Sequence, residues 1–148
     1  MTGREGKPVR TARAAASHGA KVVGTARDLA KAQAALAEHT GLGIEVVECD
    51  LASLASVRAC ADGLKARGEK FDVIIANAGV MNCPKGKTAD GFETQFGTNH
   101  LGHFTLVNRL VPLLNDGGRV VILSSSAHRA GDVDLDDPGI EKTEYDAF

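Results

Sequence analysis

The sequence predicts an α/β protein built on a doubly wound parallel sheet, and two patterns support this fold class. Short runs rich in β-branched residues alternate along the chain with longer segments rich in alanine and leucine. The short runs are continuously apolar, as is typical of strands buried on both faces of a parallel sheet. Right-handed crossovers between such strands give a doubly wound fold, in which ligands bind at the carboxyl ends of the strands.

Each expected element follows from its own composition. The helical segments carry alanine and leucine at helical spacing and have a glycine near the end, as at Gly19 and Gly41. The strands are expected at 20–26, 44–50, 71–79 and 119–125, and the helices at 11–19, 28–41, 53–68 and 91–114. Gly117 and Gly118 are expected to form the turn before the last strand.

Composition narrows the class of protein. The chain has 148 residues, 43% of them apolar, and no repeat or linker divides it, so residues 1–148 are expected to form one domain. A net charge of −2 without a basic patch argues against nucleic-acid binding. Cys49, Cys60 and Cys83 form no CxxC pair, which favours free thiols in a reducing compartment. No apolar run approaches the about 20 residues of a membrane span, so we expect a soluble, cytoplasmic protein.

Polar residues follow the first two expected strands. Arg27 stands where NAD-binding sites usually place an acid for the ribose 2′-hydroxyl, and an arginine there suits the 2′-phosphate of NADP. The simpler alternative is a surface arginine at the start of a helix. Asp50 could accept from an adenine amino group, or it could cap the following helix, a role for which Ser53 competes.

The later strand ends and the longest helix also carry polar residues. Gly79 permits close backbone approach, and Asn77 can bridge neighbouring strands with its side chain. Ser125 can hold a carbonyl or alcohol oxygen, and no G-x-S-x-G motif marks it as a nucleophile. Asn99 stands mid-helix against its propensity, which predicts a role such as holding a water or bending the helix.

Two histidines on the same helix raise the alternative of a metal site. His100 and His103 are three residues apart, but no carboxylate or cysteine at metal-binding spacing accompanies them. Packing or surface display is the simpler interpretation of both side chains, and no metal is expected.

Five sequence blocks in consecutive order resemble the short-chain dehydrogenase/reductase family. They are "GAKVVGTARDLAKA", "CDLASLASVR", "DVIIANAGVM", "TADGFETQFGTNHLGHF" and "RVVILSSSAH", and the similarity extends from Thr11 to Phe148. The residues of these blocks are most similar to those of the branch that contains retinol dehydrogenases and protochlorophyllide reductases. The resemblance implies a Rossmann-like fold and hydride transfer between NADP(H), preferred over NAD(H), and a small carbonyl or alcohol substrate. It also implies a homo-oligomer, because the helix around Asn99 forms a dimer face in many relatives.

The resemblance assigns roles to the residues that match the family's motifs. It implies that Ser125 steadies the reacting oxygen and that Asn99 holds a water in a proton relay. The residues that it assigns to cofactor binding are Gly3, Gly6, Arg27, Asp50, Leu51, Asn77, Ala78 and Gly79.

The chain also departs from the family's pattern. The family's catalytic Tyr-x-x-x-Lys pair is absent, because the only tyrosine is Tyr145, which we interpret as a residue upstream of the catalytic one. The family's first strand and its last strands are also expected to be missing. In the glycine turn, Gly6 matches the middle glycine and Pro8 replaces the last one.

These departures keep a second function open. The alternative is a non-catalytic fragment that binds the cofactor weakly or only associates with other subunits. A doubly wound methyltransferase, a third class of function, would need an acid at the position of Arg27.

Overall fold

The computed structural model describes residues 7–37, 41–129, 131 and 134–147. The chain forms two units, residues 1–50 and 51–148. In each unit two parallel strands pair, β1 with β2 in the first and β3 with β4 in the second. The predicted class, an incomplete α/β fold with parallel strands, is confirmed.

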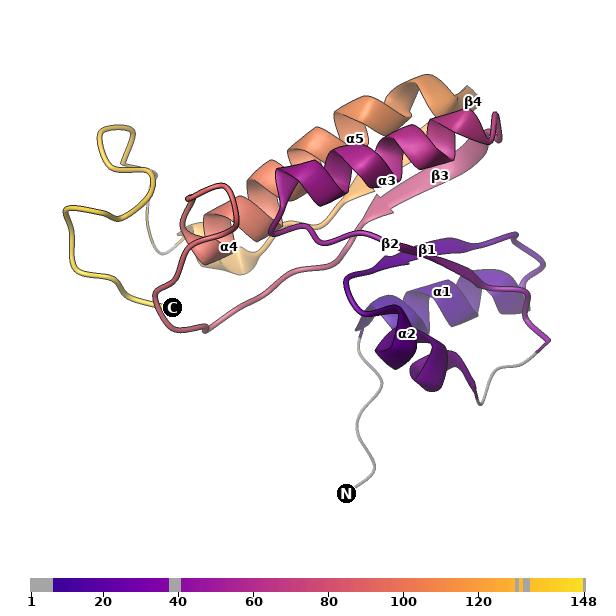
Figure 1. Ribbon diagram of the computed structural model, residues 1–148, viewed down its shortest axis with the longest axis horizontal. Coiled ribbons are helices and arrows are strands. Elements are labelled where there is room, and N and C mark those ends of the chain that lie inside the picture. Colours follow the sequence, from indigo (N-terminus) through magenta and orange to yellow (C-terminus); the bar gives the residue numbers. More distant parts are fainter. Residues whose placement is uncertain (1–6, 38–40, 130, 132–133, 148) are drawn as a thin grey trace. The chain divides into compact units, whose positions relative to one another are not determined.

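The first unit alternates helices and strands (Figure 1). Its elements are α1 (Lys7–Ser17), β1 (Val23–Ala26), α2 (Leu29–Leu36) and β2 (Glu45–Glu48). Gly19 follows α1 with a φ of 87°, a conformation that favours glycine at the end of a helix. Asp28 caps α2 by accepting a 3.0 Å hydrogen bond from the backbone N–H of Lys31.

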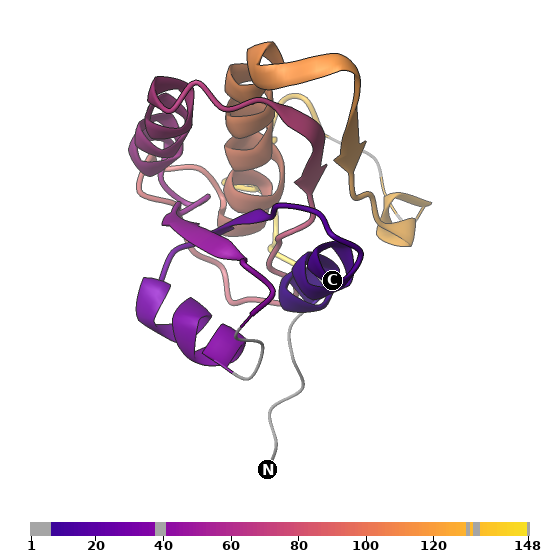
Figure 2. The same ribbon diagram turned by 90° about the vertical axis from the view of Figure 1, so that its right-hand side faces the viewer.

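The second unit places two helices side by side next to the β3–β4 pair (Figures 1 and 2). Its main elements are α3 (Leu54–Ala66), β3 (Phe71–Ala76), α5 (His103–Leu110) and β4 (Leu114–Ile122). The core is formed by the buried side chains Val57, Cys60, Ala61 and Leu64 of α3 and Leu106, Val107 and Leu110 of α5. Ser53 caps α3 through a hydrogen bond from the N–H of Ser56, so Ser53 holds the cap for which Asp50 competed.

The strands differ from the expected single sheet covered on both faces. The described strands form two separate two-stranded sheets, β1 with β2 and β3 with β4. One side of the second pair is exposed: Val73, Ile75 and Val121 are 46%, 45% and 43% exposed, whereas Ala76 is 5% exposed. These strands therefore carry apolar side chains that the described residues leave exposed.

The long helix expected over 91–114 is a continuous helical stretch over 94–113 that changes type along its length. This region contains α4 (Thr94–Phe96), a π-helix η2 (Gly97–Gly102), α5 and a 3₁₀ turn η3 (Val111–Leu113). The α-helix ends at Leu110, two residues before Pro112, whose ring cannot continue a helix. Gly97 and Gly102 lie in close contact with Thr88 and with the carbonyl of Leu51, where a Cβ would collide.

The glycines Gly117 and Gly118, expected to form a turn before the last strand, lie within the bounds of β4 but precede its regular pairing with β3, which resumes at Arg119. The pairing shifts between Phe71↔Leu114 and Val73↔Arg119, so β4 carries extra residues opposite β3. Such a bulge needs residues that tolerate unusual backbone angles, and Gly117 has a φ of 78°.

Candidate functional site

The first unit brings two predicted residues to one edge of its strand pair. Ala26 pairs with Glu48 at the carboxyl ends of β1 and β2, and the N–H of Cys49 donates to the carbonyl of Ala26 at 2.9 Å. Arg27 and Asp50 follow these ends directly. Arg27 is exposed and makes no ion pair with any residue that the structure describes, so its guanidinium is available to an anion.

The second unit has an equivalent edge. Ala76 pairs with Ile122, and the N–H of Leu123 donates to the carbonyl of Ala76 at 3.1 Å. The segments that carry Asn77 and Ser125 therefore leave the sheet from neighbouring strands at the same edge. Ser125 is exposed, and its carbonyl accepts from the N–H of His128 at 3.3 Å.

The turn after β3 is held by side chains from the interrupted helix. Asn99 accepts from the N–H of Val80 at 2.8 Å and donates to the carbonyl of Val80 at 2.7 Å. Nε2 of His103 lies 2.7 Å from the carbonyl oxygen of Ala78. A Cβ on Gly79 would lie 3.0 Å from Oδ1 of Asn99, so only glycine fits here without a shift. The structure thus brings Ala78, Gly79 and Asn99 together.

Two polar atoms near this turn are buried without a hydrogen bond to any described residue. They are Nδ2 of Asn77 and Nδ1 of His103. Buried polar atoms are normally satisfied, so an unpaired donor at a strand end indicates a partner outside the described residues. The sugar hydroxyls of a dinucleotide are acceptors of the required kind.

Sequence reasoning missed the role of His103, which we had interpreted as a packing or surface residue. Its spacing four residues after Asn99 was the available signal, because residues at this spacing share a helix face. Among the residues that the structure describes, no group of three or more potential metal ligands gathers.

Gln95 is a second residue that sequence reasoning missed. Its amide Nε2 donates to the hydroxyl of Tyr145 at 3.0 Å and to the carbonyl of Ala147 at 3.2 Å, and its Oε1 accepts from the N–H of Asn82 at 3.2 Å. The hydroxyl of Tyr145 in turn donates to the carbonyl of Cys83 at 2.9 Å. Partial burial raises the pKa of Tyr145 above its ordinary value. Tyr145 is therefore engaged in holding two segments together.

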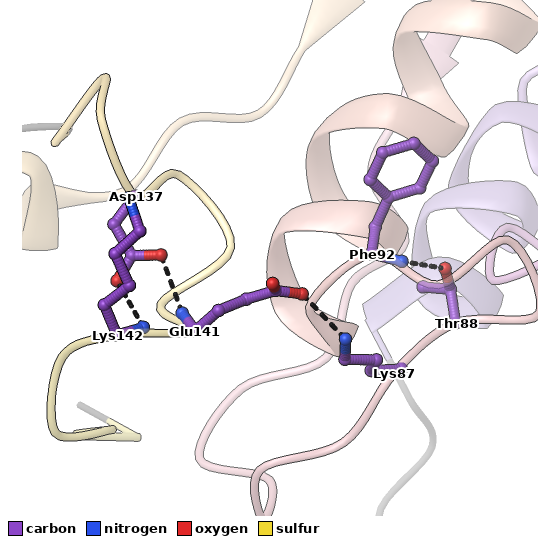
Figure 3. A network of polar contacts seen from close by, with 6 residues as sticks. All are labelled: Lys87, Thr88, Phe92, Asp137, Glu141 and Lys142. Carbon is purple, nitrogen blue, oxygen red and sulfur yellow. Dashed lines mark hydrogen bonds and ion pairs between the residues drawn. The ribbon is translucent and has the colours of Figure 1, made fainter.

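The segment before Tyr145 has its own polar network, shown in Figure 3. One carboxylate, Asp137, accepts from the backbone N–H groups of Glu141 and Lys142 at 2.7 and 2.9 Å. Glu141 forms a 2.7 Å ion pair with Lys87, in which both side chains are 61% exposed. An ion pair this exposed contributes little to stability, so the buried Asp137 is the main anchor of this segment.

The remaining predicted positions lie elsewhere. Leu51 is buried, and its carbonyl lies against Gly102. Gly3 and Gly6 are outside the described residues, so the structure gives no account of the glycine turn. Two hollows of about 430 and 450 Å³ are lined by other residues and contain none of the predicted site residues.

Comparison with known proteins decides the family. The family profile described as enoyl-(acyl carrier protein) reductase, one of the short-chain dehydrogenases, matches residues 8–140. The chain belongs to the short-chain dehydrogenase/reductase family. It is 41% identical to mouse retinol dehydrogenase 14 and 43% identical to human retinol dehydrogenase 12, and these matches cover 88% and 89% of the chain. The chain spans 44% of the length of each of these curated relatives.

Solved structures agree with this assignment. The chain superposes on an uncharacterized protein from Mycobacterium paratuberculosis with a TM-score of 0.84 and 46% identity, over 93% of this chain and 48% of the other. A metagenomic short-chain oxidoreductase crystallised with NADP matches with a TM-score of 0.60 and 29% identity, over 71% of this chain and 49% of the other. Among the described residues, no helix has both the length and the apolar character needed to cross a membrane.

Proposed function

We propose that the chain is the cofactor-binding part of an NADP(H)-dependent oxidoreductase, which transfers a hydride between the nicotinamide and a carbonyl or alcohol substrate. The observation that carries this proposal is the turn after β3, where Asn77 keeps a buried donor without a described partner beside the closely packed Gly79. The family membership and the NADP complex of a relative support it.

The proposed cofactor contacts are assigned to each unit separately. In the first unit, Arg27 would bind the 2′-phosphate and Asp50 would accept from the adenine. In the second unit, the turn formed by Asn77, Ala78 and Gly79 would line the dinucleotide, and Leu51 would contribute from its own segment. Gly3 and Gly6 would approach the pyrophosphate.

The chemistry divides between cofactor and protein. The bound cofactor supplies or accepts the hydride. Ser125 would hold the substrate oxygen at the strand edge, and Asn99 would support the proton relay while it fixes Val80. NADP differs from NAD by its 2′-phosphate, so a preference for NADP would depend on Arg27.

A second function, a non-catalytic chain that binds cofactor, is favoured by the state of Tyr145. The hydroxyl of this residue is engaged with Gln95 and Cys83. A general acid or base must exchange a proton with the reacting oxygen, whereas the hydroxyl of Tyr145 is occupied by these two contacts. The two functions share the same cofactor site and differ only in turnover.

The proposal is tested by the binding of NADPH and NADH to the purified chain and to Arg27→Asp, measured by isothermal titration calorimetry. Loss of a charge-assisted contact to phosphate should weaken NADPH by about ten- to a hundredfold and leave NADH nearly unchanged. Arg58→Asp, an equal charge change at an exposed position of α3, is the matched control and should preserve the ratio.

Two results would count against this account. Equal losses of NADPH affinity in both variants would show a general charge effect and remove the basis for NADP preference. An absence of binding by either dinucleotide would contradict the proposed function itself. Consumption of NADPH in the presence of an aldehyde by the same preparation would decide for the enzyme over the non-catalytic alternative.

A further inference from the structure

Side chains from one helical stretch bond three backbone polar groups of the turn Asn77–Val80. The side chain of Asn99 forms hydrogen bonds with both the N–H and the carbonyl of Val80. Nε2 of His103 forms a hydrogen bond with the carbonyl oxygen of Ala78. Within the described part of the chain, the N–H and the carbonyl of Gly79 make no hydrogen bond, and Nδ2 of Asn77 is buried without one. The helix therefore decides which groups of the turn remain available to a ligand.

The contact of His103 fixes the form of its ring. A carbonyl oxygen only accepts, so Nε2 must carry the proton that lies between His103 and Ala78. In the neutral ring Nδ1 then has a lone pair, and this atom is buried with no partner among the described residues. A buried acceptor without a donor is a cost, which packing alone would avoid with an apolar side chain. The hydrogen bond to Ala78 offsets that cost.

His100 lies one helical turn before His103 and serves as a comparison, because its ring has no hydrogen bond of this kind. Its ring is exposed and stacks against Phe96 and Phe104, with ring centroids 5.3 and 6.1 Å away. The ring makes no hydrogen bond to any residue in the described ranges. The two histidines are thus a natural pair for comparison on one helical stretch.

We propose that His103 is a positioning residue that sets the conformation of the turn Asn77–Val80, so that the exposed Gly79 presents its free backbone groups to the dinucleotide. Without His103, the carbonyl of Ala78 would lose its donor, and the peptide between Ala78 and Gly79 could rotate. This inference rests on the proposed function, because it names a determinant of the same cofactor site.

The test uses four single variants of the complete chain. His103→Phe keeps an aromatic ring and removes the donor, whereas His103→Gln keeps a side-chain N–H. His100→Phe and His100→Gln are the matched controls. Two quantities are measured for each variant: the dissociation constant for NADPH, and the rate of amide hydrogen exchange at Val80, whose N–H is bonded to Asn99, in the cofactor-free chain.

The proposal expects His103→Phe to weaken NADPH binding about tenfold and to speed exchange at the Val80 amide by a similar factor. His103→Gln should recover most of both effects, which a mere loss of packing would not allow. The His100 variants should match the unmodified chain in both measurements. In the unmodified chain, the ¹⁵N spectrum of the neutral His103 ring should show the tautomer with the proton on Nε2.

Unchanged exchange and unchanged NADPH affinity in His103→Phe would overturn the proposal, and so would equal losses in the Phe and Gln variants. Faster exchange in His103→Phe with unchanged NADPH affinity would also overturn it, because the turn would then not matter for the ligand. If the unmodified chain binds no NADPH, the proposed function fails, and the exchange rates alone decide whether His103 sets the turn.

Discussion

Replacing Gly102 by alanine tests how tightly the interrupted helix packs on the segment that follows Asp50. A Cβ at Gly102 would collide with the carbonyl of Leu51 and would lie 3.1 Å from the Cβ of the same residue. The obstacle is backbone, which cannot turn aside as a flexible side chain could. The variant can fold only if η2 and the segment at Leu51 move apart.

The magnitude follows from two opposing contributions. Overpacking of a close contact costs about 1–3 kcal/mol, and alanine gains up to about 1 kcal/mol over glycine within a helix. The net loss for Gly102→Ala should be about 1–2 kcal/mol of the free energy of unfolding. Gly63 lies in the middle of α3, and a Cβ added there would have no other atom within 4 Å, so Gly63→Ala should gain about 0.5–1 kcal/mol.

The assay is urea unfolding of the unmodified chain and both variants, followed by far-ultraviolet circular dichroism. The slope m should stay constant, so that a shift of the midpoint reports stability alone. Opposite signs for the two glycine-to-alanine changes are the expected result. A Gly102→Ala chain as stable as the unmodified one would refute the close approach of η2 to Leu51.

Two further predictions concern titrating groups of the C-terminal segment. Desolvation raises the pKa of Asp137, but the backbone N–H groups of Glu141, Lys142 and Thr143 outweigh it and lower the pKa to about 2 from 3.8. Its contribution to stability should be complete above pH 3.8 and fade as the pH falls towards 2, and a pH series of unfolding midpoints should show this loss in the unmodified chain but not in Asp137→Asn. Tyr145 is the only tyrosine, and the chain has no tryptophan, so its pKa can be read from ultraviolet absorbance. Desolvation should place that pKa above 10.0, and a midpoint at 10.0 would contradict the burial of its hydroxyl.

The sequence predicted the order of helices and strands because periodicity and glycine placement are local properties. Arg27, Asp50, Asn77 and Ser125 could be placed at strand ends by the same reasoning, since parallel strands share one carboxyl edge. The roles of these residues came from the family resemblance.

The structural details that the sequence did not predict depend on contacts between different segments of the chain. The π-helical stretch forms where Gly97 and Gly102 meet Thr88 and Leu51, residues remote in sequence. The contact of His103 with Ala78 joins residues 25 positions apart, so the spacing of His103 from Asn99 shows the shared helix face but not the partner. The pair Gly117 and Gly118 predicts a turn from sequence alone. Only the pairing with β3 shows that the turn lies inside β4 as a bulge.

The most direct test of the central claim is an NMR titration of the ¹⁵N-labelled chain with NADPH. The account predicts saturable shifts of the Gly79 backbone amide and the Asn77 side-chain amide, with the His100 ring unaffected. Saturation of binding without any shift at Gly79 and Asn77 would contradict the claim that the turn after β3 is the cofactor edge.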